Sequence, residues 1–117
     1  MALYDQLPVY KSCYDLLLQL YQVTKNMERD YKFTLGENIK NESTALILLI
    51  YKANATYNKS EILAQAKEKV EVIRLLLRIY NDLKQISIQQ FVLLSEQIES
   101  ISKQINAWYA SQTKTTN

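Results

Sequence analysis

Segment 64–86 constrains the fold of this chain most, because it reads as one helix with apolar side chains on two faces. At about 100° per residue, the first face consists of Ala66, Val70, Ile73, Leu77 and Tyr80. The second, on nearly the opposite side, consists of Val72, Leu75, Ile79, Leu83 and Ile86. A surface helix of a small bundle needs only one apolar face. The second face therefore predicts a further burial partner, either other helices wrapped around it in a compact bundle or another subunit.

The rest of the chain is also typical of helices. Its 117 residues include one glycine and one proline, which leaves little to interrupt a helix and predicts a single all-α domain over residues 1–117. Start signals are Pro8 at a first helical position, capping-box spacing at Thr34 and Ser87, and Asn58 or Ser60 for the third helix. The expected helices are 8–28, 35–55, 60–86 and 88–110, followed by a frayed polar tail, 113–117. Short connections predict an up-down antiparallel four-helix bundle.

The composition argues against catalysis and metal binding. There is no histidine and only one cysteine, Cys13, so neither a histidine-based nucleophile nor a zinc site can be built. One glycine, Gly36, cannot make a phosphate loop. We expect a non-enzyme without cofactors or metals. The lone cysteine fits a reducing cytoplasm, the N-terminus lacks the layout of a signal peptide, and the longest apolar run, 45–51, is too short to span a membrane.

A narrow charged strip separates the two apolar faces, and its cations Lys67, Arg74 and Arg78 are the candidate binding site. Guanidinium groups donate two parallel hydrogen bonds to phosphate, and several copies around a symmetry axis would focus their potential. The alternative is a merely solvated strip, in which Lys67–Glu71 and Arg78–Asp82 pair at i, i+4 spacing. The net charge of +2 is low for a dedicated nucleic-acid-binding domain, so any anion contact must come from local placement.

Six stretches also have the residues and spacing of a known family. They are LPVYK (7–11), YDLLL (14–18), YKFTLGE (31–37), VEVIRLLLR (70–78), DLKQIS (82–87) and IESISKQI (98–105), with Trp108 after the last. Together they make the chain resemble the accessory variability determinant proteins of diversity-generating retroelements. That family lies within a wider group of four-helix proteins that includes the 23S rRNA intervening-sequence proteins.

The resemblance implies a homopentameric barrel of four-helix bundles. It also implies a protein that binds the reverse transcriptase of the retroelement and its template RNA or cDNA during mutagenic retrohoming. Arg74 and Arg78 align with an arginine pair on the family's third helix, where basic surface is linked to these contacts. The second apolar face would then pack against a neighbouring subunit. A stand-alone protein of the intervening-sequence type, structural or ribosome-associated, is the alternative.

Overall fold

The computed structural model describes the backbone of residues 3–115 and the side chains of residues 3–112. Within this part of the chain there are four long helices and no strand: α1 (Pro8–Thr24), α3 (Glu37–Ala55), α4 (Ser60–Asp82) and α5 (Ile88–Thr115). A 3₁₀ turn, η1 (Tyr4–Gln6), precedes them, and a short α2 (Arg29–Tyr31) with a π-helical turn, η2 (Lys32–Gly36), joins α1 to α3. The all-α class and the four-helix bundle are therefore confirmed.

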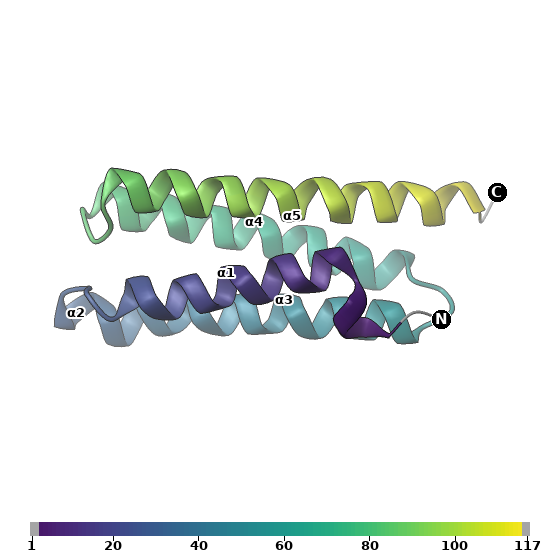
Figure 1. Cartoon of the computed structure of the whole chain (residues 1–117), viewed down its shortest axis with the longest axis horizontal. Helices are drawn as coiled ribbons and strands as arrows, with labels where there is room; N and C mark the ends of the chain where they lie inside the picture. The colour runs from purple at the N-terminus through teal and green to yellow at the C-terminus, as the bar shows by residue number, and fades with distance from the viewer. Residues whose placement is uncertain (1–2, 116–117) are drawn as a thin grey trace.

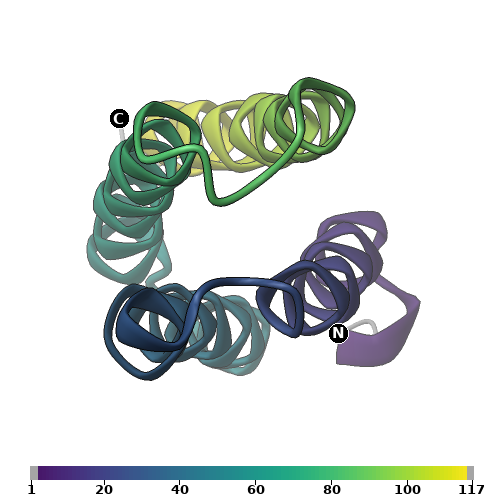
Figure 2. The ribbon, with the colours of Figure 1, turned by 90° about the vertical axis from the view of Figure 1, so that its left-hand side faces the viewer.

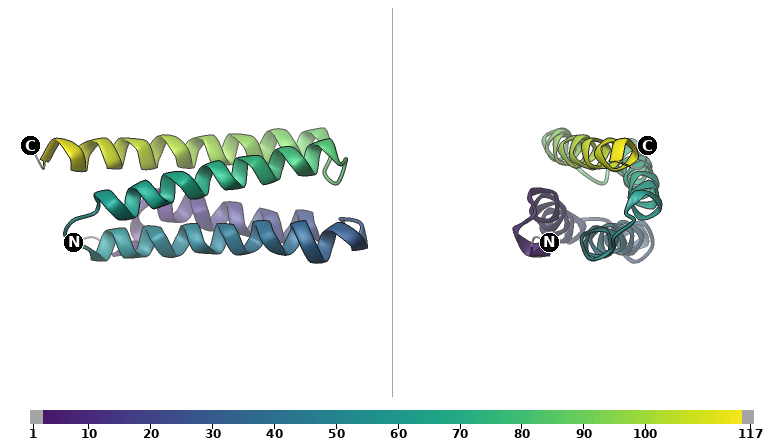
Figure 3. Two further views of the ribbon diagram at one scale, coloured as in Figure 1. Left: turned by 180° about the vertical axis from the view of Figure 1, so that it is seen from behind. Right: turned by 90° about the vertical axis from the view of Figure 1, so that its right-hand side faces the viewer.

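The four long helices run alternately up and down, as Figures 1 and 3 show. They pack in a closed cycle in which α3 contacts α1 and α4, and α5 also contacts α1 and α4. Consequently α1 and α4 occupy diagonally opposite corners, which is visible when the bundle is viewed end-on (Figure 2). The bundle measures 48 × 21 × 21 Å. The outer sides of α1 and α4 thus belong to opposite sides of a rod.

The core is a single apolar column along this rod. Each long helix contributes one row of buried side chains at spacings of three and four, as a bundle helix should. The fully buried ones include Leu16 and Leu20 of α1, Ile39, Leu46 and Ile50 of α3, Ile73 and Tyr80 of α4, and Leu94, Ile98, Ile101 and Ile105 of α5. The first predicted face of α4 is buried throughout, so the helical periodicity assigned this row correctly.

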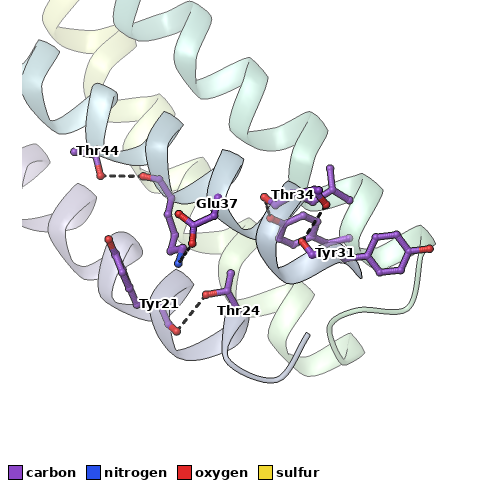
Figure 4. Close-up of polar contacts among 9 residues, drawn as sticks. Tyr21, Thr24, Tyr31, Thr34, Glu37 and Thr44 are labelled. Carbon is purple, nitrogen blue, oxygen red and sulfur yellow. Dashed lines mark hydrogen bonds and ion pairs between the residues drawn. The ribbon is translucent and has the colours of Figure 1, made fainter. Parts of the chain in front are cut away.

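The connection between α1 and α3 differs from the predicted one. The capping box expected at Thr34 is absent: the Thr34 hydroxyl donates instead to the carbonyl of Asp30, at 2.8 Å, within the π-helical turn (Figure 4). A π-helical turn widens the helix and disturbs the regular backbone bonds. The carbonyl oxygen of Leu35 accepts a hydrogen bond from the hydroxyl of buried Tyr80. This bond ties the turn to α4.

The connection between α4 and α5 also differs from the predicted one. The third helix was expected to continue to Ile86, but α4 ends at Asp82, and Lys84 has φ of 57°, in the left-handed region. Helical spacing therefore stops before Ile86, whose side chain turns into the core and is almost fully buried. Ile86 does not belong to the exposed second face. The capping box at Ser87 is confirmed, because Ser87 and Gln90 bond each other's backbone N–H reciprocally, at 3.1 and 2.9 Å.

The remaining helix ends lie close to the predicted positions. α1 stops at Thr24, short of the expected 28, while α4 begins at Ser60 without a side-chain cap. The amine of Lys59 instead binds carbonyl oxygens at the end of α3, including that of Ala53 at 2.7 Å, and so serves as a C-cap for that helix. α5 extends to Thr115, into the tail that was expected to fray, and residues 116–117 lie outside the described part.

Candidate functional site

The three candidate cations lie on the side of α4 that faces α5. Two contacts establish this orientation: Arg74 binds Glu99 of α5, and the amine of Lys67 lies 4.3 Å from the ring centre of Tyr109 of α5. The spacing of the three residues on one helix predicts a common stripe, and the structure agrees. The stripe follows the line along which α4 meets α5.

Arg74 is the most strongly held of the three. Its Nε donates to Oε1 of Glu99 at 2.8 Å, and its Nη1 pairs with Glu71, three residues earlier on α4. The side chain is only 29% exposed. Two carboxylates around one guanidinium leave this spot without net positive charge, so a phosphate would have to compete with both. The Lys67–Glu71 pair expected from sequence is not formed, because Glu71 turns toward Arg74 instead.

Arg78 is far more accessible to a ligand than Arg74. Its side chain is 79% exposed, and its nearest carboxylate, that of Asp82, lies 3.9 Å from Nε, at the limit of an ion pair. Exposed i, i+4 pairs of this kind contribute little free energy. An anionic ligand could therefore replace Asp82 as the partner of Arg78 with little loss of stability. Of the predicted cations, Arg78 therefore has the geometry best suited to bind a partner in this structure.

The stripe is divided between two neighbouring grooves. Arg74 and Arg78 line one of about 410 Å³, whose floor includes Leu77, Phe91 and Ile98. Lys67 lines another of about 550 Å³, toward the end of α5. Glu71 borders both. The structure thus brings the two arginines together and places Lys67 beside them in a separate groove.

The second apolar face of α4 is exposed, with the exception of Ile86. Leu75 is 58% exposed, Val72 and Leu83 are also exposed, and Ile79 is half-buried. Leu48 of α3, 55% exposed, extends the patch, and Val72 and Leu48 line a common groove between the two helices. Continuous exposed apolar surface of this kind usually marks a protein–protein contact. The compact bundle does not wrap this face.

Two residues of the site, Glu99 and Leu48, were not predicted from the sequence. Glu99 reaches Arg74 from a different helix, and single-helix spacing contains no information about the register between α4 and α5. Leu48 did carry a signal, since it lies in an apolar run, 46–50, that is apolar on all sides of the helix.

The buried titratable side chains Cys13 and Tyr80 both have raised pKa values. Burial raises the pKa of the Cys13 thiol to about 12, and burial together with the nearby Glu37 carboxylate raises the pKa of Tyr80. A thiol with such a pKa is a poor nucleophile at neutral pH. Among the described residues, no group of three or more histidine, cysteine, aspartate or glutamate side chains is placed to hold a metal ion. No helix there is long and apolar enough to cross a membrane.

Comparison with known proteins gives one match. The model of a protein family described as bAvd-like matches residues 7–112, which include α1, α3, α4 with its two arginines and its exposed apolar face, and α5 as far as Gln112. A search of curated proteins finds no match.

Proposed function

This chain belongs to the bAvd-like family, and from that premise we propose that it is a non-catalytic accessory protein of a diversity-generating retroelement. It acts in the cytoplasm, assembles as a homopentamer, and binds the retroelement's reverse transcriptase together with template RNA or cDNA. In this way it supports mutagenic retrohoming, while the error-prone synthesis belongs to the polymerase. The observation that carries the proposal is the family match over 7–112, which covers nearly the whole bundle.

The exposed apolar patch supports the assembly. Leu48, Val72 and Leu75 leave α3 and α4 with a continuous apolar surface that the bundle itself does not cover. Removing such surface from water stabilises a complex by roughly 25 cal/mol for each Å² buried. The proposed subunit contact therefore consists of the exposed and half-buried residues of the second α4 face, Val72, Leu75, Ile79 and Leu83, together with Leu48.

The arginine groove supports the partner contact. Arg78 offers an open guanidinium, and Arg74 stands one turn away with its charge balanced by Glu71 and Glu99. This balance favours a polypeptide of the reverse transcriptase as the main ligand of the groove, because a polypeptide can contact both signs of charge and the apolar floor. RNA or cDNA contacts Arg78 and Lys67 more weakly.

The test is a double substitution, Arg74→Ala with Arg78→Ala, measured against both partners. We expect reverse transcriptase binding to fall at least about tenfold, the equivalent of 1.4 kcal/mol, with a smaller loss of RNA binding. The control is Arg29→Ala with Lys103→Ala, which removes two exposed cations from α2 and α5 outside the groove. Unchanged binding to both partners in the groove variant contradicts the assigned site.

A stand-alone protein of the intervening-sequence type remains the alternative. It is favoured by the balanced charge around Arg74, which a purely structural bundle would tolerate equally well. That function predicts no binding to any reverse transcriptase, in the wild-type chain as in the variants.

A further inference from the structure

The outer side of α1 has an exposed apolar stripe of its own. Tyr14, Leu18 and Tyr21 follow one another at spacings of four and three, and each is about half exposed, with Leu18 at 50%. They lie opposite the buried row of α1, and the same chain covers them only in part: the amine of Lys40 of α3 lies 4.8 Å from the ring centre of Tyr21, and Leu18 borders a groove beside Gln97 of α5. Two exposed lysines frame the stripe: Lys11 lies seven residues before Leu18 and Lys25 seven residues after it.

The outer side of α4 has the same layout with the opposite charge. Leu75 is the central exposed residue there, Glu68 lies seven residues before it and Asp82 seven residues after it, and both carboxylates are exposed. Seven residues are close to two helical turns, so each set of three forms one row along its helix. At 1.5 Å per residue the charges of each row are about 21 Å apart.

The two rows therefore have the same length, each has a leucine at its centre, and their charges are opposite in sign. One reads basic–Leu–basic and the other acidic–Leu–acidic, and the match holds whether the helices meet parallel or antiparallel. Among the residues whose side chains the structure describes, no ion pair involves Lys11, Lys25 or Glu68, and Asp82 has only the long contact with Arg78. Lys25 immediately follows α1 and keeps helical backbone angles, so the row extends to it.

The placement of the rows suits contact between copies. Because α1 and α4 occupy opposite corners of the bundle (Figures 2 and 3), one chain cannot join its own two rows. Each copy can instead offer its α1 row to one neighbour and its α4 row to another. Such a head-to-tail contact builds a ring when its rotation closes.

From this match we infer that the α1 row, Lys11–Leu18–Lys25, is the counterpart of the α4 row, Glu68–Leu75–Asp82, on a second copy of this chain. This inference rests on the proposed assembly and names the surface that the exposed α4 face contacts. Opposite charges set the register and exclude wrong partners, while the leucines and tyrosines between them supply apolar burial.

The test is charge reversal, read as native mass by light scattering. In Lys11→Glu/Lys25→Glu both rows are acidic, and we expect the dissociation constant of the assembly to rise at least about tenfold because like charges face each other. Adding Glu68→Lys/Asp82→Lys exchanges the signs of the two rows and should restore the wild-type mass. The control Arg29→Glu/Lys103→Glu makes the same change of net charge away from both rows and should assemble normally. Helix content by circular dichroism verifies folding, since all the substituted side chains are exposed.

The outcomes separate this inference from the proposed assembly. A wild-type chain that stays monomeric contradicts the assembly and this inference with it. A wild type that assembles while Lys11→Glu/Lys25→Glu keeps the same mass overturns only the α1 row. Dissociation that the exchanged variant fails to reverse also overturns the pairing of the rows.

Discussion

Replacing Glu99 by glutamine should strengthen RNA binding, although Glu99 itself is not expected to touch RNA. Its carboxylate accepts a hydrogen bond from Arg74 Nε at 2.8 Å and cancels much of that guanidinium's charge. Glutamine has the same shape and still offers an oxygen acceptor, but it carries no charge. Arg74 then becomes an additional cation that phosphate can use, with only the exposed Glu71 competing for it.

The size of the effect follows from counterion release. One additional phosphate contact steepens the slope of log K against log salt by about 0.7 for single strands. At 0.1 M salt this corresponds to roughly fivefold tighter binding. The assay is fluorescence anisotropy with a labelled single-stranded RNA of about 20 nucleotides, titrated between about 0.05 and 0.3 M salt. Both the affinity and the slope should change.

Glu96→Gln is the matched control. Glu96 lies one turn earlier on the same helix and is exposed, and its substitution changes the net charge equally without removing a contact to Arg74. We expect Glu96→Gln to change the slope by much less than Glu99→Gln. Equal changes would show that only net charge matters, and no change in Glu99→Gln would refute the claim that this carboxylate restrains Arg74.

Three further predictions concern stability. Tyr80→Phe removes the hydrogen bond to the Leu35 carbonyl and should cost about 1–2 kcal/mol, lowering the melting temperature by several degrees; an unchanged melting temperature would show that water replaces the bond. Leu46→Ala should cost about 2–5 kcal/mol in urea unfolding because Leu46 is fully buried, whereas Leu48→Ala should cost about 0.5 kcal/mol or less in the monomer and weaken assembly instead; equal costs would contradict the assigned faces. Burial raises the Cys13 pKa from 9.0 to about 12, so the thiol's contribution is fully present below pH 9 and is lost as pH rises toward 12. The urea midpoint of the wild type should therefore fall more between neutral pH and about pH 10.5 than that of Cys13→Ala, and parallel losses would contradict this.

Sequence periodicity predicted the helices because burial in a bundle follows a simple rule. The row of Ala66, Val70, Ile73 and Tyr80 is buried as expected, since one helix period determines which side chains share a face. The capping box at Ser87 was also readable, because the two residues that bond each other are three apart in the chain.

Helical periodicity did not predict the features that depend on the path of the chain between helices. Ile86 was assigned to the exposed face because no local sequence signal predicts the left-handed backbone of Lys84, after which helical spacing no longer applies. Thr34 has capping-box spacing, yet tertiary packing selected a π-helical turn there, fastened by Tyr80 from α4.

At the candidate site too, the sequence predicted what depends on one helix and not what depends on the packing of two. Helical spacing placed Arg74 and Arg78 on one stripe, but it could not reveal that Glu99 neutralises Arg74, because that contact depends on how α4 and α5 align. The charge-matched rows on α1 and α4 are visible in the sequence only once the structure shows that both are exposed and on opposite corners of the bundle.

The most direct test of the central claim is the native mass of this chain co-expressed with the reverse transcriptase that the proposed function gives it as a partner. We expect one complex whose mass equals that polymerase plus five copies of the 13.7 kDa chain, and we expect Arg74→Ala/Arg78→Ala to release a free pentamer. Separate elution of the polymerase and a monomeric wild-type chain would contradict both the assembly and the accessory function.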